Sequence, residues 1–232
     1  MKLVNIKEIK GTITLQSGLH IGAGDTEIKI GGTDNPVVKH PHTGEPYIPG
    51  SSLKGKIRSL LEMRSGQMGK TNGEPLGFKH LKDLKGDELE ECTTIIKLFG
   101  ASGADEDKYG IGPCRASFAD CPIAEEWKIQ AVNDQLALSE VKSENSIDRI
   151  RGTAGGGGPR FIERVPSGVE FSFSISLKEL EENENLEDFL LEGMKLLEMD
   201  ALGGSGSRGY GQVKFKFDDK ELQKRFESLQ PF

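Results

Sequence analysis

Alternation of apolar and polar residues marks three candidate strands. Residues 4–15 read VNIKEIKGTITL, residues 168–177 read GVEFSFSISL, and residues 211–217 read GQVKFKF. A period of two places alternate side chains on opposite faces of a strand, so each stretch predicts a half-buried strand. The inward positions expected in the first two strands are Ile6, Ile9, Ile13 and Leu15, then Val169, Phe171, Phe173, Ile175 and Leu177.

Two stretches repeat their apolar residues at helical spacing instead. The first follows Ser51 and Ser52, either of which is a favourable helix N-cap, and it predicts a helix over residues 52–63. The second predicts an amphipathic helix over residues 185–199. The apolar positions of the first helix are Leu53, Ile57, Leu60 and Leu61.

The segments between these elements are less regular. Residues 65–90 are polar and glycine-rich and predict a loop or insertion, while IIKLFG at 95–100 predicts a short helical or extended piece. PCRASFADCPI at 113–123 predicts a core strand, and residues 139–165, which contain AGGGGP, predict a long hairpin with a mobile tip. The resulting order is that of an α+β ferredoxin-like sheet, β-α-β-β-α-β, with insertions.

Charge is distributed unevenly along the chain. The net charge is −7, and residues 178–200 contain nine acids and two lysines, so this segment accounts for the whole excess. Residues 50–64 and 149–164 each carry +3, so the acidic total does not exclude a nucleic-acid partner. No apolar run reaches the length of about eighteen residues that a membrane span needs, and the N-terminus lacks an apolar signal core. These features predict a cytoplasmic protein.

The three cysteines do not form a metal or disulfide pattern. Cys92, Cys114 and Cys121 contain no C-x-x-C pair, and their number is odd. Zinc-site spacing is therefore absent, and a disulfide framework is not expected. We interpret all three as ordinary reduced thiols.

Residues 47–58, YIPGSSLKGKIR, combine features of three chemistries. The G-x-x-x-x-G-K spelling is that of a phosphate-binding loop, but Ile57 stands where such a loop needs Ser or Thr for magnesium. Ser51 and Lys54 form the S-x-x-K pair of a serine acyl-enzyme, and SEN at 143–145 resembles its S-x-N partner, but no K-T-G follows. Both of these enzymatic interpretations are disfavoured.

The third interpretation is a grip on RNA phosphates. Lys54 and Arg58 lie four residues apart on one helix face, beside the free N–H groups and the positive end of the helix dipole. The stretches IGAG and GGSGSRGYG allow close backbone approach elsewhere. GSGSRG also matches a dinucleotide-binding fingerprint, but it leads into a strand rather than a helix. The alternative to phosphate binding is a solvated basic face.

Seven stretches resemble one known family in both order and spacing. They are LHIGAGD, GGTDNPV, YIPGSSLKGKIR, KLFG, EVKSENSIDR, PRFIERV and LGGSGSRGYG, and they extend from about residue 6 to residue 216. The family is the RAMP superfamily. Within it, the chain is most similar to the repeated backbone subunit of type III-A (Csm) CRISPR effector complexes.

This resemblance implies a fold and a set of partners. The fold would be a modified ferredoxin-like, RNA-recognition (RRM-like) fold with inserted loops and a protruding thumb β-hairpin. Residues 1–232 would form a single domain, with insertions at about 65–110 and the thumb-like hairpin at about 125–165. Copies would stack as a filament along a CRISPR RNA, with complementary target RNA and other subunits of the effector complex as further partners and no membrane.

The resemblance also implies which residues contact RNA. The helix that begins near Ser51 and the glycine loop at 203–211 would lie on the guide backbone, and the thumb would separate guide from target. Solvated surface is the alternative for the thumb arginines. The implied RNA-binding residues are Ser51, Ser52, Lys54, Arg58, Arg149, Arg151, Arg160, Gly204, Ser205, Gly206, Ser207 and Arg208.

The cleavage aspartate of the family falls on Asp34 in GGTDNPV. Its carboxylate would anchor a divalent ion, Mg²⁺ or Mn²⁺, or take the proton from a 2′-hydroxyl group, whereas its local sequence alone is typical of a turn cap. His20 would contact RNA or assist catalysis, or make a structural hydrogen bond, and Glu140 and Glu144 are candidate further metal ligands. The implied function is that of a metal-dependent endoribonuclease subunit. The alternative is a non-catalytic structural filament subunit that binds CRISPR RNA.

Overall fold

The central sheet has four antiparallel strands. The computed structural model describes residues 1–24, 35–102, 106–156, 158–181 and 184–232. Across the sheet the strand order is β2-β7-β1-β8, and every neighbouring pair is antiparallel. The three strands predicted from alternation are all present, while the strand predicted over 113–123 is confined to three residues. The bounds are β1 Asn5–Leu15, β2 Ala116–Phe118, β7 Glu170–Glu179 and β8 Val213–Phe217.

One face of this sheet carries the hydrophobic core. Alternate residues of β1 and β7 are buried and meet across the register, as Ile13 does with Phe171. Ile9 is 1% exposed, as predicted, but Ile6 is 50% exposed. The two residues are three positions apart, so they point to opposite faces of the strand and the inward prediction for Ile6 is wrong.

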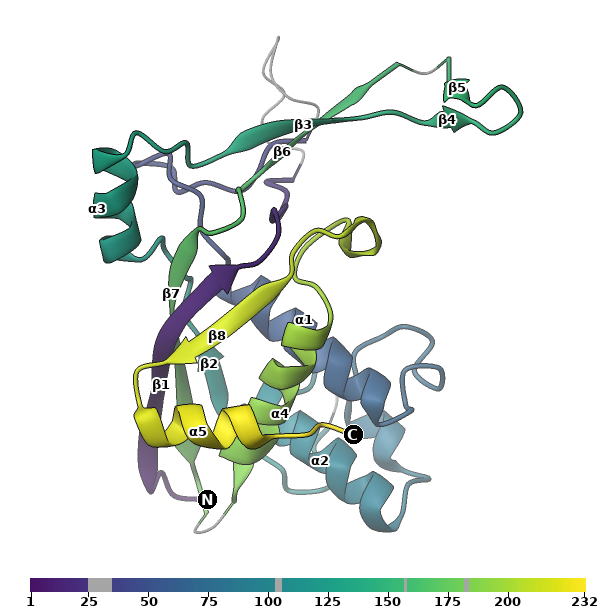
Figure 1. The fold of residues 1–232 in the computed structure, drawn as a ribbon. Helices are drawn as coiled ribbons and strands as arrows, with labels where there is room; N and C mark the ends of the chain where they lie inside the picture. The colour runs from purple at the N-terminus through teal and green to yellow at the C-terminus, as the bar shows by residue number, and fades with distance from the viewer. Residues whose placement is uncertain (25–34, 103–105, 157, 182–183) are drawn as a thin grey trace.

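Three helices pack over the core face (Figure 1). Helices α1 (Gly50–Arg64) and α4 (Leu186–Met199) were both predicted, and α2 (Gly86–Phe99) flanks them. A Cβ atom at Gly193 of α4 would lie 2.7 Å from Cγ2 of Ile57 in α1, so glycine there permits the close approach of the two helices. No helix of the described residues is both long and apolar enough to cross a membrane.

Three helices were not predicted, namely α2, α3 (Glu125–Asn133) and α5 (Lys220–Ser228). Helix α2 occupies residues assigned to a loop and to a short piece, and its buried residues recur at helical spacing. Helix α3 takes up the start of the range expected for the hairpin. The side chain of Asp219 caps α5 by accepting hydrogen bonds from two backbone N–H groups. A short 3₁₀ helix, η1 (Phe78–Leu81), lies in the expected insertion.

The start of α1 differs from the prediction. Neither Ser51 nor Ser52 is its N-cap, because the helix begins at Gly50 after Pro49 and makes no side-chain capping bond of its own. Asp120 supplies the cap from a distant segment, since its Oδ1 accepts a hydrogen bond from the N–H of Gly50 at 2.8 Å. A Cβ at Gly50 would lie 2.3 Å from the carbonyl oxygen of Phe118, so this packing requires glycine. Both serine hydroxyls are thereby left without a capping role.

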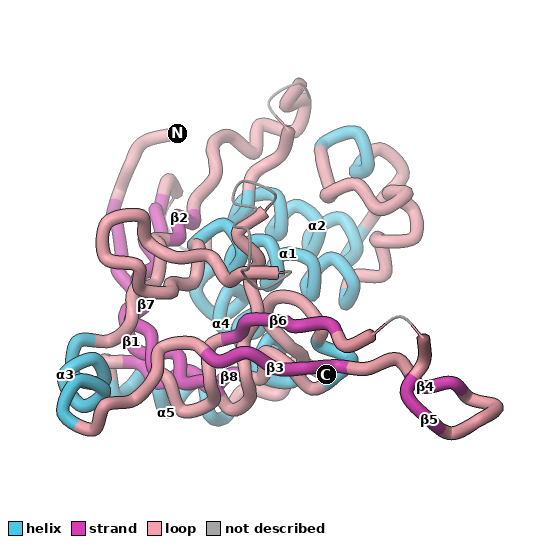
Figure 2. Tube along the Cα trace, turned by 90° about the horizontal axis from the view of Figure 1, so that it is seen from above, coloured by secondary structure: helices cyan, strands magenta, loops and turns pink. Residues whose placement is uncertain are grey.

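A long hairpin leaves the body of the molecule. Its stem pairs β3 (Glu140–Glu144) with β6 (Arg160–Arg164), and its outer part pairs β4 (Ile147–Asp148) with β5 (Thr153–Ala154). Figures 1 and 2 show the hairpin extending well beyond the sheet and helices in two perpendicular views. We call residues 140–164 the hairpin.

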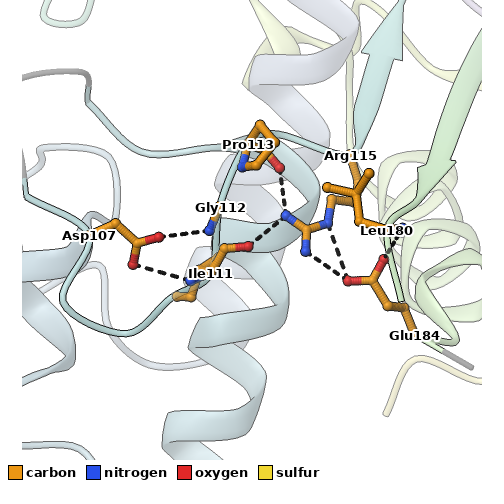
Figure 3. A network of polar contacts seen from close by, with 7 residues as sticks. All are labelled: Asp107, Ile111, Gly112, Pro113, Arg115, Leu180 and Glu184. Carbon is orange, nitrogen blue, oxygen red and sulfur yellow. Dashed lines mark hydrogen bonds and ion pairs between the residues drawn. The ribbon is translucent and has the colours of Figure 1, made fainter. Parts of the chain in front are cut away.

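A buried ion pair fixes the loop before β2 (Figure 3). The guanidinium of Arg115 is fully buried and lies 2.8 Å from Oε1 of Glu184, which precedes α4. It also donates to the carbonyl oxygens of Ile111 and Pro113, each at 2.6 Å. Burial raises the pKa of the Glu184 carboxyl, but hydrogen bonds from Arg115 and the N–H of Leu180 outweigh this effect and lower it. The pair joins the 107–115 segment to the β7–α4 connection.

Candidate nucleic-acid interface

His20 joins three segments near the base of the hairpin. Its Nδ1 lies 2.7 Å from the carbonyl oxygen of Glu163 in β6, so this nitrogen carries the proton and donates. Its own carbonyl oxygen accepts a hydrogen bond from the N–H of Gly204 at 2.8 Å. A Cβ at Gly203 would lie 2.4 Å from that oxygen, so the approach requires glycine. His20 therefore makes the structural hydrogen bond considered from sequence, and in the neutral ring Nε2 is left as an acceptor.

The carboxylate of Glu163 is the most buried acid of this region. Oε2 accepts from the N–H of Val37 at 3.0 Å, and Oε1 accepts from Nζ of Lys39 at 2.5 Å and from Oγ of Ser139 at 2.7 Å. Burial raises the pKa of Glu163, but these three hydrogen bonds outweigh it and hold the pKa below its ordinary value. Glu163 is thus an anion that ties the segment 35–39 to the hairpin.

The chain after the predicted cleavage residue is bound to the same strand. Asp34 itself lies outside the described residues. Asn35, which follows it in the sequence, forms a parallel bridge with Ile162, and its carbonyl oxygen accepts from the N–H of Glu163 at 3.2 Å. The next residues, 36–39, remain attached through the Glu163 carboxylate. The sequence around the predicted cleavage residue therefore meets the hairpin base at Asn35.

Tyr210 links the glycine loop, residues 203–211, to the hairpin. Its ring is fully buried, and its hydroxyl donates to Oε1 of Glu144 at 2.7 Å. Nζ of Lys142 and Cζ of Arg164 lie 4.7 and 4.9 Å from the ring centroid, within the range of cation–π attraction. The hydrogen bond from Tyr210 lowers the pKa of Glu144, despite a smaller opposing effect of burial. The loop is therefore held against β3 and β6.

The tip of the glycine loop stays at the surface. Ser205 has φ of +63°, a left-handed conformation that is uncommon outside glycine, and Gly204, Ser207 and Arg208 are exposed. Arg208 donates to Ser205 Oγ, and its Nε lies 3.4 Å from Glu144. Contacts thus bring the predicted residues of this loop, including half-buried Gly206, into one network with His20 and the hairpin.

The predicted residues of α1 lie at a second place. Ser51 and Lys54 line an open cleft of about 440 Å³ together with Cys114, Ser117 and Lys178. Nζ of Lys54 lies 3.6 Å from the Cys114 sulfur. Ser52, one residue on, is half-buried. The cleft therefore combines two ammonium groups with two hydroxyls beside the first turn of a helix.

Arg58 does not share this cleft. Its Nε donates to Oε1 of Glu62 at 2.7 Å, and a second nitrogen donates to the carbonyl oxygen of Leu76 at 2.6 Å. The side chain is 15% exposed. The same Glu62 oxygen accepts from the N–H of Leu76, so Arg58 holds the 65–76 segment against α1. The charge of Arg58 is thus paired with Glu62 rather than placed beside Lys54, and its predicted contact with RNA stays a prediction.

The hairpin arginines are surface residues. Arg149, Arg151 and Arg160 are all exposed, and the side chain of Arg151 makes a long ion pair of 4.0 Å with Asp148. Ile150 lies between two of them at the turn and is 97% exposed. An apolar side chain so exposed at the end of a projecting hairpin is not there for the core of this chain.

A family model decides where the chain belongs. The model described as RAMPs, the RAMP superfamily, matches residues 12–214, which include the end of β1, α1, the hairpin and the glycine loop. The chain belongs to the RAMP superfamily.

Individual RAMP relatives extend this result. A protein of Methanocaldococcus jannaschii named CRISPR system Cms endoribonuclease Csm3 is 42% identical over 213 residues, which cover 90% of this chain and 77% of that protein. A protein of the same name from Streptococcus thermophilus is 40% identical and covers 88% and 84% of the two chains. A chain in the crystal structure of the Csm3-Csm4 subcomplex of the type III-A CRISPR-Cas interference complex superposes with a TM-score of 0.57 at 26% identity, over 99% of both chains.

The predicted RAMP metal ligands on the hairpin are engaged elsewhere. Glu140 accepts from Nε of Arg164 at 2.7 Å, and Glu144 is bonded to Tyr210 and Arg208. Within the described ranges, no group of three or more His, Cys, Asp or Glu side chains is placed to hold a metal ion. Both carboxylates are thus engaged with partners of this chain, and their predicted role as metal ligands, like that of Asp34 outside those ranges, stays a prediction.

Sequence reasoning missed the residues that assemble this RAMP site. Glu163 and Arg164 stand in PRFIERV, and Tyr210 ends GGSGSRGY. The sequence predicted roles for other residues of these stretches, such as Arg160 and Arg208, but none for these three. The available signal for Glu163 was an acid directly after the apolar pair Phe161 and Ile162, because a carboxylate that becomes buried in a strand requires partners. For Tyr210 the local sequence offers no such signal, since its cationic neighbours come from 46 and more residues away along the chain.

Proposed function

We propose that this chain is a CRISPR RNA-binding backbone subunit of a type III-A effector complex, and that it cleaves guide-complementary target RNA at regular intervals. The observation that carries the proposal is 42% identity, over 90% of the chain, to a protein named Cms endoribonuclease Csm3. Further copies of the chain in a filament and other complex subunits, such as the Csm4 of the similar structure, are the proposed cytoplasmic partners.

The proposed fold is a modified ferredoxin-like, RRM-like fold in one domain over residues 1–232. The strand order β2-β7-β1-β8 supports it, because a β-α-β-β-α-β chain closes its sheet in that order. Residues 65–110 would be an insertion, since α2 and η1 lie outside that pattern. The hairpin would be the thumb, and it begins at Glu140 rather than at about 125.

Two surfaces would hold the guide RNA. At the first turn of α1, Lys54 and Lys178 supply positive charge, and the hydroxyls of Ser51 and Ser117 supply neutral donors, all on one open cleft. Such contacts bind phosphates without reading base sequence. The glycine loop forms the other surface, with exposed Ser207 and Arg208. Arg58 is left out of this proposal because its charge is neutralised inside the protein.

The hairpin tip would separate guide from target. Ile150 is an exposed apolar side chain between two exposed arginines, Arg149 and Arg151. Proteins that unstack nucleic acids use such apolar wedges, while flanking cations bind the phosphates. Arg160, at the start of β6, would add a further phosphate contact. We assign Ile150 as the wedge.

Replacing Ile150 by serine is expected to slow target cleavage about tenfold, because a wedge that offsets about 1.4 kcal/mol of unstacking cost changes the productive population by that factor. The side chain is 97% exposed, so the free energy of unfolding should stay within about 0.5 kcal/mol. Single-turnover cleavage by the assembled complex measures the effect. Val132→Ser on α3, where valine is 74% exposed, is the matched control and should cut normally. Equal rates for both variants would remove Ile150 from the wedge role.

Cleavage would use the substrate's own 2′-hydroxyl. Its oxygen attacks the adjacent phosphorus, the bond to the 5′-oxygen of the next nucleotide breaks, and a 2′,3′-cyclic phosphate forms. Asp34 would take the proton of the attacking hydroxyl. His20 is a second candidate for proton transfer or RNA contact, because its Nδ1 is occupied by Glu163 and Nε2 is the remaining acceptor. The wedge would flip a nucleotide of the target out of the duplex, and this would place the attacking 2′-oxygen, the phosphorus and the departing 5′-oxygen in line.

A divalent ion, Mg²⁺ or Mn²⁺, is part of the proposal through Asp34 alone. Magnesium is commonly bound by one or two carboxylates together with substrate phosphates, rather than by a cage made only of protein groups. A single carboxylate beside bound RNA is consistent with this mode of binding, which does not require a cluster of metal ligands among the described residues. Such an ion would stabilise the charge that develops on the phosphate.

The test is cleavage by complexes assembled around a guide RNA. With labelled complementary RNA and Mg²⁺ we expect cuts at a regular spacing, loss of cutting with EDTA, and recovery with Mg²⁺ or Mn²⁺, while target binding persists throughout. A non-complementary RNA should remain uncut. Binding without any cutting would favour the structural filament subunit, and cutting that resists EDTA would leave proton transfer by Asp34 or His20 without a metal requirement.

A further inference from the structure

A buried carboxylate at the hairpin base has no part in the RNA contacts proposed above. Glu163 is 8% exposed, and its two oxygens receive three hydrogen bonds, from Val37, Lys39 and Ser139. Its backbone adds two more, one to the carbonyl oxygen of Asn35 and one from His20. One residue thus contacts three separate parts of the chain, namely residue 20, residues 35–39 and residue 139.

Filling the space at the hairpin base with the Glu163 carboxylate is energetically unfavourable compared with an apolar side chain. Burying a charged carboxylate is unfavourable unless hydrogen bonds compensate, and an apolar side chain of similar size often packs at no loss of stability. Apolar packing at the hairpin base is already provided by Ile162 and Val165, which are 7% and 3% exposed. In addition, the hydrogen bonds of the carboxylate are directional, so they hold the backbone N–H of Val37 and the Lys39 ammonium at defined positions.

The residues fixed in this way border the proposed cleavage site. Asn35 to Lys39 follow Asp34 without a break, and His20, the second proton-transfer candidate, is bonded to the carbonyl oxygen of the same Glu163. The carbonyl oxygen of His20 in turn receives Gly204 of the glycine loop. We infer that Glu163 is a positioning residue for RNA cleavage, because it holds the 35–39 segment and His20 at fixed positions relative to the hairpin. This inference rests on the proposed function.

The isosteric variant Glu163→Gln tests the inference. Three donors converge on Glu163, and glutamine offers one acceptor oxygen and an NH₂ group that would face a donor, so the segment 35–39 must shift. We expect the single-turnover cleavage rate of bound target to fall between about 10- and 100-fold, as misplacement of reacting groups does elsewhere. Affinities for guide and target should stay unchanged, because Glu163 makes no contact in either proposed RNA-binding surface.

Hydrogen exchange provides a readout that does not depend on activity. The Val37 amide donates directly to the carboxylate, so its exchange should accelerate in Glu163→Gln, whereas the amide of Phe171 in the central sheet should exchange as in the unmodified protein. Glu126→Gln on α3, an exposed acid, is the matched control and should change neither rate nor exchange. Lys39→Met removes one of the three donors and should show a smaller effect in the same direction.

The outcomes separate this inference from the proposed function. If the unmodified complex binds target without cutting, the proposed function fails. Hydrogen exchange at the Val37 amide still tests whether Glu163 positions the 35–39 segment. If Glu163→Gln cuts at the normal rate, or loses guide binding together with cleavage, Glu163 is not a positioning residue. Unchanged Val37 exchange would equally overturn the inference. If Glu163→Gln does not fold, Lys39→Met decides between these outcomes on the same two measurements.

Discussion

Asp34→Asn is expected to abolish target-RNA cleavage while the complex still assembles and binds its target. Asparagine has nearly the same shape and keeps a side-chain oxygen of the kind that can cap a turn, but it neither accepts a proton at neutral pH nor brings negative charge to a metal ion. Loss of a positioned proton acceptor lowers rates by about 100- to 10,000-fold. Single-turnover cleavage of labelled target, with binding measured in parallel, gives both quantities.

Asp218→Asn is the matched control for this substitution. Asp218 is exposed, and its backbone N–H donates to the carbonyl oxygen of Lys10, so cleavage should be normal. Loss of both binding and cleavage in Asp34→Asn would make Asp34 a turn residue. Cleavage at the normal rate would transfer the proton-accepting role to His20, whose Nδ1 hydrogen bond leaves Nε2 available.

The sheet and its two main helices were predictable because each has a local signal. Val169 to Leu177 alternate without interruption, and all five apolar positions are buried, four of them in β7. Helix α5 also has a local signal, since Asp219 caps it and Leu222 and Phe226 share one face, but the β-α-β-β-α-β order predicted from the sequence has no helix after its last strand. Helix α2 was not predicted because its first five residues belong to the polar, glycine-rich stretch 65–90, which is typical of a loop.

The candidate site was less predictable, because its contacts connect distant segments. The resemblance located His20, Glu144 and the glycine loop, and the structure joins them, although their proposed roles stay predictions. The predictions from charge patterns gave the positions of cations along the chain, but they did not assign the acids with which these cations pair. Lys54 lines an open cleft, whereas Arg58, one turn later, is paired with Glu62. The four-residue spacing of Arg58 and Glu62 is a local signal for this pairing, and Lys54 has no acid four residues further on.

The second large effect is expected on stability, from Arg115→Met. Arg115 is fully buried, and its guanidinium binds Glu184 and two carbonyl oxygens. Removing one partner of a buried ion pair leaves an uncompensated charge and commonly costs about 3–5 kcal/mol in the free energy of unfolding. Chemical denaturation of the isolated chain measures the loss. Arg151→Met on the hairpin, where the side chain is 80% exposed, should stay within about 0.5 kcal/mol.

The pH dependence of this loss identifies its cause. In the native protein the pKa of Glu184 is lowered, so its contribution to stability is present above the unfolded-state pKa and disappears as the pH falls through the folded-state pKa. Without Arg115, burial alone would raise that pKa, and the carboxyl would take up a proton and lose its buried charge. The difference between Arg115→Met and the unmodified chain should therefore shrink as the pH is lowered from 7 to about 4. If instead the difference is independent of pH, its cause is the loss of hydrogen bonds to Ile111 and Pro113. If Arg115→Met does not fold, Glu184→Gln, which keeps the shape of the side chain and removes its charge, is expected to give a smaller destabilisation that can be measured in the same way.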